Sequence, residues 1–204
     1  EQWIKERIGD SEATISDLRR PSGSGMSSET LLFNAKAKNT NHNTEYSLVA
    51  RLAPTPADIP VFQKYDLDLQ VRIMKIVQER TSIPIPNVLW LETDPTVLGV
   101  PFFVMEQVDG RVPPDIPPYV FGGWILETSL ENQKILEHQS VGIISQLSKI
   151  DLKDIDTNFL EFEDEGNSHL RRHFSAQRNY YQWVIGDKRK HPVIEHAFTW
   201  LEQN

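Results

Sequence analysis

The residues with the clearest chemical potential form a run of small side chains near the N-terminus. Gly23 and Gly25 let backbone N–H groups approach an anion closely, because glycine has no side chain to hold the anion away. Ser24, Ser27 and Ser28 add hydroxyl donors to the same run. This composition suits a loop that covers phosphate groups. Ordinary hairpin turns use the same residue types, so the loop by itself leaves both interpretations open.

A cation is expected beside this loop. Extended runs flank the loop, and the polar turn 39–43 joins the second run to a third that ends at Leu52, which predicts a three-strand antiparallel ribbon. Side chains alternate between the two faces of a strand, so Val49 and Arg51 share one face. Arg51 can then reach phosphates held under the loop; the alternative is that it is only a surface residue.

Composition and charge exclude several classes of protein. The chain of 204 residues carries a formal net charge of −8, which argues against nucleic acid or an anionic membrane as a partner. No apolar stretch reaches the length of a membrane span, and the N-terminus lacks the apolar core of a signal peptide, so we expect a cytoplasmic protein. The absence of cysteine excludes a disulfide framework and thiolate chemistry.

The first part of the chain alternates helical and extended patterns. A short helix is expected within 1–12 and a longer one from about 61 to 80, and strands are expected at 87–92 and 100–108. The last strand is apolar almost throughout, which predicts a central strand or one covered on both faces. The buried stripe predicted for the second helix is Phe62, Tyr65, Leu69, Ile73, Ile76 and Val77.

The second part of the chain is predicted to be helical. The proline-rich segment 112–118 is a semi-rigid spacer and marks a boundary between residues 1–110 and 111–204. The fold class is therefore α+β. Helices are predicted at 130–149, 168–185 and 192–202.

The order of these elements and several motifs resemble the aminoglycoside phosphotransferase and choline-kinase-like superfamily, which has a protein-kinase-like fold. The resemblance covers essentially the whole chain. It implies an N-lobe with a five-stranded antiparallel sheet plus a helix, followed by the first helices of a helical C-lobe. The motifs are 23–31 for the nucleotide loop, 48–52 for the strand with the cation, 101–110 for the hinge and 147–151 for a helix end, while 178–183 and 197–201 are similar to acyl-CoA-dehydrogenase-associated kinases.

The resemblance implies an ATP-dependent phosphotransferase that uses Mg²⁺ and acts on a hydroxyl of a small molecule. Arg51 stands where the family has a phosphate-binding cation, and Val49 would contact the adenine face. The backbone of Glu106 and Val108 would hydrogen-bond the adenine edge. The implied contacts in the loop are Gly23, Ser24, Gly25, Met26, Ser27 and Ser28.

The chain departs from the family at the residue that supports this cation. Related kinases hold the cation with a glutamate of the following helix, and the best-aligned position here is the neutral Gln70. Asp66 lies one turn earlier on the same helical face. We therefore predict an ion pair between Arg51 and Asp66.

A larger departure concerns the catalytic residues. The sequence contains no His-Gly-Asp loop followed by Asn and no later metal-binding Asp, which the family places just after an element like 198–202. We therefore expect the chain to be an N-terminal fragment, inactive by itself, with the Mg²⁺ ligands outside it. The alternative is a non-catalytic, pseudokinase-like nucleotide-binding or regulatory module, which Gln70 favours. Apolar helix faces left uncovered would predict self-association.

Two other patterns resemble metal sites, but each has a simpler interpretation. The segments 66–68 and 154–156, which we call the acidic triplets, each carry two aspartates separated by one apolar residue. We expect them to lie at solvated helix ends or turns. His169 and His173 have the spacing of zinc ligands on a helix, yet the sequence offers no cysteine and no obvious third ligand. We expect no metal site in this chain.

Overall fold

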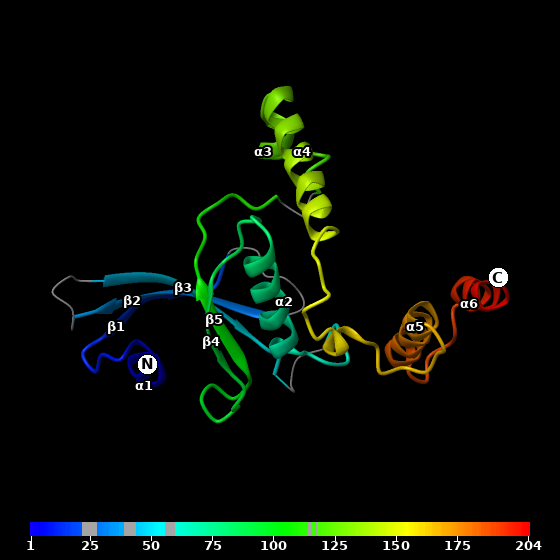
Figure 1. Cartoon of the computed structure of the whole chain (residues 1–204), viewed down its shortest axis with the longest axis horizontal. Helices are drawn as coiled ribbons and strands as arrows, with labels where there is room; N and C mark the ends of the chain where they lie inside the picture. The colour runs from blue at the N-terminus through cyan, green and yellow to red at the C-terminus, as the bar shows by residue number, and fades with distance from the viewer. Residues whose placement is uncertain (22–27, 39–43, 56–59, 114–115, 117) are drawn as a thin grey trace.

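The computed structural model describes residues 1–21, 28–38, 44–55, 60–113, 116 and 118–204 (Figure 1). The predicted order of three strands, a helix and two strands is confirmed. The elements of the first part are α1 (Gln2–Ile8), β1 (Thr14–Arg19), β2 (Glu29–Ala37), β3 (Thr44–Leu52), α2 (Leu67–Arg80), β4 (Val88–Glu92) and β5 (Phe102–Glu106). Those of the second part are α3 (Trp124–Glu127), α4 (Leu130–Leu147), the 3₁₀ turn η1 (Asn158–Leu160), α5 (His169–Ile185) and α6 (Pro192–Gln203).

The five strands form one antiparallel sheet in the order β1-β2-β3-β5-β4, as the resemblance implied. β5 lies between β3 and β4. Its consecutive residues Phe102, Phe103 and Val104 are all buried, so both faces of this strand are covered. The prediction of a central strand is confirmed, and its apolar sequence follows from that position.

Helix α1 packs on one face of the sheet. The Trp3 ring meets the rings of Phe102 and Trp90 edge-on, with centroids 4.8 and 6.1 Å apart, and its Nε1–H donates to Glu92 Oε2 (2.7 Å). The helix ends four residues before the predicted boundary, because Gly9 adopts a left-handed conformation (φ 76°) and its N–H bonds to the carbonyls of Lys5 and Glu6.

Helix α2 packs against β4 and β5, but it begins at Leu67 rather than near residue 61. Its N-cap is Asp66, whose carboxylate accepts the N–H of Leu69 (2.8 Å). The predicted buried stripe is partly wrong: Phe62 is 49% exposed and Ile73 is 40% exposed, while Leu67 and Val71 are buried. The periodicity was compatible with either face, and the contacts with the sheet select the face with Leu67 and Val71.

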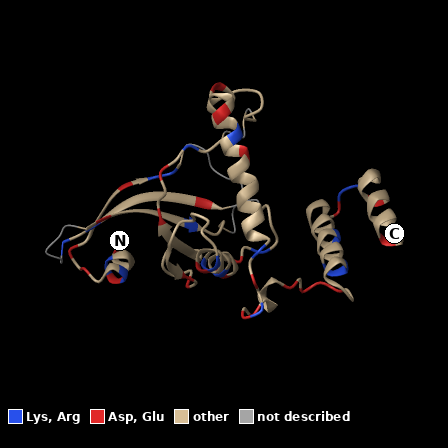
Figure 2. Ribbon diagram, turned by 45° about the horizontal axis from the view of Figure 1, so that its top comes forward, with Lys and Arg blue, Asp and Glu red and all other residues tan. Residues whose placement is uncertain are grey.

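The helices of the second part lie away from the sheet (Figure 1). Figure 2 shows the two signs of charge on different helices: α5 carries basic residues and no acidic ones, whereas α6 carries acidic residues and no lysine or arginine. No residue of α4, α5 or α6 is buried, and Leu130 and Ile144 are 75% and 67% exposed. The prediction that apolar helix faces are left uncovered is confirmed for α4, while the boundary at residue 110 stays a prediction. Within the described ranges, no helix is both long and apolar enough to cross a membrane.

Candidate functional site

Strand β3 presents Val49 and Arg51 on the same face, as predicted. Opposite residues of antiparallel strands share a face, and Val49 pairs with Met105 of β5 while Arg51 pairs with Phe103. Leu48 and Ala50 point the other way, into the core that α1 covers. Val49 is buried and Arg51 is partly exposed, so an apolar contact and a cation lie side by side on this face.

The Arg51 guanidinium contacts Ser28, the residue just before β2. Arg51 Nε and Nη2 donate to Ser28 Oγ over 3.2 and 2.9 Å. The strand register explains this contact: Thr30 pairs directly with Arg51, and Ser28, two residues earlier, lies diagonally opposite on the same face. The structure thus brings together two residues that were predicted to bind phosphate. Their contact with each other was not predicted.

The other loop residues predicted to bind phosphate are Gly23, Ser24, Gly25, Met26 and Ser27. All five lie outside the described residues. Their role as nucleotide contacts stays a prediction.

The predicted ion pair between Arg51 and Asp66 is not formed in the structure. Asp66 is exposed and caps α2. Among the described residues 1–21, 28–38, 44–55 and 60–113, Asp66 and Arg51 form no ion pair with each other. The physical reason is that the first turn of a helix needs acceptors for its N–H groups, and Asp66 is the nearest side chain that supplies one. Gln70 is partly buried one turn further along α2, and its supporting role stays a prediction.

At the end of β5 the backbone is still hydrogen-bonded to the neighbouring segments on both sides. Glu106 N–H donates to the Asn87 carbonyl (3.0 Å), and Gln107 N–H donates to the Ser47 carbonyl (2.8 Å). Val108 N–H bonds to no other described residue, and Val108 is 67% exposed. The Glu106 carbonyl and the Val108 N–H are therefore the groups at which an adenine edge could add hydrogen bonds, as the resemblance implied.

The side chain of Gln107 forms a hydrogen bond within this segment. Its Nε2 donates to Asp109 Oδ1 (3.2 Å), while its Oε1 is buried without a partner among the described residues. A buried acceptor without a donor is costly, so this side chain has one unmet hydrogen bond at the hinge. Sequence reasoning missed Gln107, because an isolated glutamine after a strand gives no signal.

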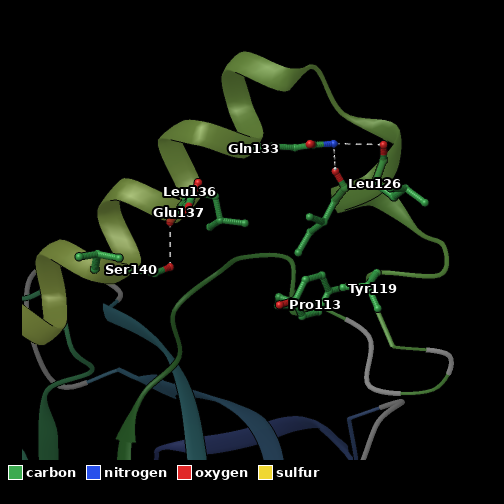
Figure 3. A pocket seen from close by; sticks show the side chains of 10 residues that line it. Pro113, Tyr119, Leu126, Gln133, Leu136, Glu137 and Ser140 are labelled. Atoms are coloured by element: carbon green, nitrogen blue, oxygen red, sulfur yellow. Dashed lines mark hydrogen bonds between the residues drawn. The ribbon is translucent and has the colours of Figure 1, made fainter.

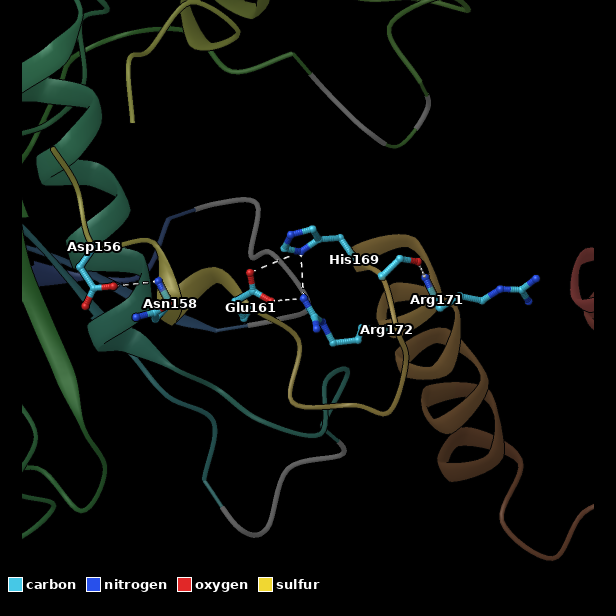
Figure 4. A network of polar contacts seen from close by, with 7 residues as sticks. Asp156, Asn158, Glu161, His169, Arg171 and Arg172 are labelled. Carbon is cyan, nitrogen blue, oxygen red and sulfur yellow. Dashed lines mark hydrogen bonds and ion pairs between the residues drawn. The ribbon is translucent and has the colours of Figure 1, made fainter. Parts of the chain in front are cut away.

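The histidines and acidic triplets make other contacts (Figure 4). Asp156 Oδ1 accepts the N–H of Asn158 (3.0 Å), so this carboxylate closes a turn as predicted. Glu161 pairs with Arg172 and lies 3.4 Å from His169 Nδ1. His173 instead meets the ring of Phe162. In the part of the chain that the structure describes, no three His, Asp or Glu side chains are grouped as metal ligands would be.

A hollow of about 590 Å³ lies between α4 and the segment that precedes it (Figure 3). Its walls are mainly apolar and include Tyr119, Ile125, Leu136 and Val141. Gln133 Nε2 shapes one end by donating to the carbonyls of Ile125 and Leu126. No residue predicted to bind the nucleotide lines this hollow. All of the predicted nucleotide-binding residues lie in the first part of the chain.

The fold agrees with the comparison to known proteins. The chain belongs to the phosphotransferase enzyme family, which it matches over residues 20–204. Its five-stranded sheet followed by helices is the kinase-like fold of the crystal structure of a putative aminoglycoside phosphotransferase from Ralstonia eutropha JMP134. That similarity has a TM-score of 0.61 at 18% identity and covers 99% of this chain and 51% of the other, so it shows the fold alone.

The chain is more similar in sequence to a plant protein than to this solved structure. The probable acyl-CoA dehydrogenase IBR3 of Arabidopsis thaliana is 36% identical over 144 residues, which cover 68% of this chain and 16% of that protein. The chain thus spans a small share of this relative and about half of the solved structure. The expectation that it is the N-terminal part of an enzyme stays a prediction.

Proposed function

We propose that this chain supplies the nucleotide-binding part of an ATP-dependent phosphotransferase that acts on a small-molecule hydroxyl. The observation that carries the proposal is the position of Arg51, a cation on the face of β3 that also bears Val49. Among the described residues, no carboxylate forms an ion pair with Arg51. A guanidinium without such a partner suits a phosphate, which it can bind through two parallel hydrogen bonds.

The proposed arrangement uses three parts of the chain. The adenine ring lies on Val49, and its edge bonds to the Glu106 carbonyl and the Val108 N–H. Arg51 binds the phosphates, and Ser28 with the loop before it adds further donors. In phosphoryl transfer the protein mainly positions the groups and stabilises charge, so these contacts would orient ATP rather than react with it.

Mg²⁺ is the second cofactor that family membership implies. When bound, it would neutralise charge on the phosphates. We assign no ligand for it within the described residues, since no cluster of metal-binding side chains occurs among them. The contribution proposed for this chain is therefore the binding and orientation of the nucleotide.

We also propose which class of compound carries the acceptor hydroxyl. The plant relative is named as a probable acyl-CoA dehydrogenase and is 36% identical, whereas the structure named for aminoglycosides is 18% identical. The nearer relative therefore favours a hydroxylated acyl compound over an aminoglycoside. Calorimetric titration of the ATP-saturated protein with a hydroxylated fatty acid and with an aminoglycoside compares the two, and preferential binding of the aminoglycoside would reject this choice.

A non-catalytic nucleotide-binding or regulatory module is the second candidate. The neutral Gln70 favours it, because related kinases have a glutamate there. The two candidates share ATP binding and differ in turnover. ADP formation in the presence of an acceptor hydroxyl would reject the regulatory module.

Calorimetric titration with Mg²⁺-ATP tests the proposal. Arg51→Ala removes the phosphate contact and is expected to raise the Kd about tenfold or more, since hydrogen bonds between ionised groups are the strong ones. Lys36→Ala is the matched control: Lys36 is another strand cation, at the far end of β2, and its partner is Glu45 of β3 (3.3 Å). Equal affinities of wild type and Arg51→Ala, or no binding by wild type, would overturn the assignment.

A further inference from the structure

We propose that Ser28 is the positioning residue of Arg51 and takes the place of the helix carboxylate that related kinases use. This inference rests on the proposed function, because it assumes that Arg51 binds nucleotide phosphates. The observation behind it is the pair of hydrogen bonds from Arg51 Nε and Nη2 to Ser28 Oγ, at 3.2 and 2.9 Å.

The contact fixes the direction of the guanidinium. Nε and one Nη of an arginine lie on the same edge of the planar group, so a single acceptor bound by both orients the whole plane. Ser28 is itself held by the sheet, because Glu29 begins β2 and pairs with Leu52. Both residues are partly buried, which limits competition from water.

The neutral partner leaves the charge of Arg51 available. A carboxylate would offset that charge and compete with a phosphate for the same donors. A hydroxyl accepts the two N–H groups without offsetting the charge, and the remaining N–H donors of Arg51 stay available to an anion. The Ser28 hydroxyl also keeps its own proton, which it can donate to a phosphate oxygen next to Arg51.

Neither of the two helix residues that could have supported Arg51 bonds to it in the structure. Asp66 accepts the Leu69 N–H as the cap of α2, and Gln70 carries no charge. In the described part of the chain, the side-chain hydrogen bonds of Arg51 go to Ser28. The sequence places Ser28 near Arg51 only once the register of β2 and β3 is known.

Four variants of the 204-residue chain test the inference by titration with Mg²⁺-ATP and with adenosine, which lacks phosphates. Ser28→Ala is expected to raise the Kd for ATP about fivefold, the effect of one lost hydrogen bond of ordinary strength. Ser28→Thr keeps the hydroxyl and is expected to restore the affinity. Ser28→Asp is expected to weaken ATP about tenfold or more, since its carboxylate occupies Arg51 and repels phosphate. Ser16→Ala, an exposed serine of β1, is the control and should bind like wild type.

A double-mutant cycle shows whether Ser28 acts through Arg51. In an Arg51→Ala background, Ser28→Ala should raise the Kd for ATP less than it does in wild type, because only the direct hydrogen bond from Ser28 to phosphate is then lost. Adenosine binding should be the same in every variant, and the thermal unfolding curves should show that each variant folds.

The outcomes distinguish a failure of the proposed function from a failure of the positioning role of Ser28. If wild type fails to bind ATP, the proposed function fails. If wild type binds ATP but Ser28→Ala binds it equally well, or loses ATP and adenosine affinity to the same degree, the positioning role is refuted. Additive effects of Ser28→Ala and Arg51→Ala would likewise show that Ser28 does not act through Arg51.

Discussion

The substitution Asp66→Ala separates two roles that the sequence allowed for this residue. As the N-cap of α2, Asp66 accepts the Leu69 N–H at 2.8 Å, and removal of such a cap costs about 1 kcal/mol of unfolding free energy. As a partner of Arg51, it would instead support ATP binding. We expect Asp66→Ala to lower the unfolding free energy by about 1 kcal/mol, with the affinity for ATP unchanged.

The matched variant Asp66→Asn sharpens this test. Asparagine caps a helix about as well as aspartate, so Asp66→Asn should restore most of the stability and lose only the interaction of the charge with the helix dipole, about 0.3 kcal/mol. Urea denaturation followed by circular dichroism measures both variants, and calorimetry measures their affinity for ATP. If Asp66→Asn were as unstable as Asp66→Ala, the cap would not explain the result. If both variants lost ATP affinity, the carboxylate would support Arg51 after all.

Four further predictions follow from the contacts described above. Hydrogen bonds from the Asp94 N–H and the Trp3 indole, together with Arg7, lower the pKa of Glu92 below its ordinary value of 4.5. The ionised carboxylate therefore stabilises the fold above pH 4.5, and this stabilisation is lost as the pH falls through the lowered pKa of the folded state, so Glu92→Gln should lower the Tm at pH 7 and lower it progressively less as the pH falls through that pKa. Gly166→Ala would place a Cβ 2.6 Å from the Arg172 backbone nitrogen, so urea titration should show a loss of about 1–3 kcal/mol, and a neutral result would contradict this packing. Val108→Pro removes the hinge N–H and should weaken ATP and adenosine alike by calorimetry, about fivefold. The exposed apolar residues of α4 predict self-association, so light scattering should give a mass above 23.5 kDa that rises with concentration, whereas a clean monomer at high concentration would contradict it.

Strand β3 and the central strand β5 show what local sequence can predict. Alternation along β3 assigned Val49 and Arg51 to one face, and the apolar run 100–108 placed β5 inside the sheet. Both predictions depend on the two-residue repeat of a strand and on the chemistry of burial, which hold whatever the distant parts of the chain do. The resemblance to kinases followed from several such local patterns in a fixed order.

The start and face of α2 show where local patterns are ambiguous. Phe62 and Ile73 are as apolar as Leu67 and Val71, so helical periodicity did not distinguish the two stripes. The choice depends on which residues meet β4 and β5. That is a property of packing, so it could not be taken from the sequence of the helix.

The sequence by itself determined the antiparallel strands, their order along the chain, the helices of the second part and the residue types of the proposed phosphate site. Only the tertiary structure decided which partner each charged side chain has. Arg51 meets Ser28 because the register of β2 and β3 places them diagonally on one face, and Asp66 turns to its own helix because the first N–H groups there need an acceptor. Periodicity and composition are local properties of the chain, whereas a hydrogen-bond partner is chosen among all groups that folding brings within about 3 Å.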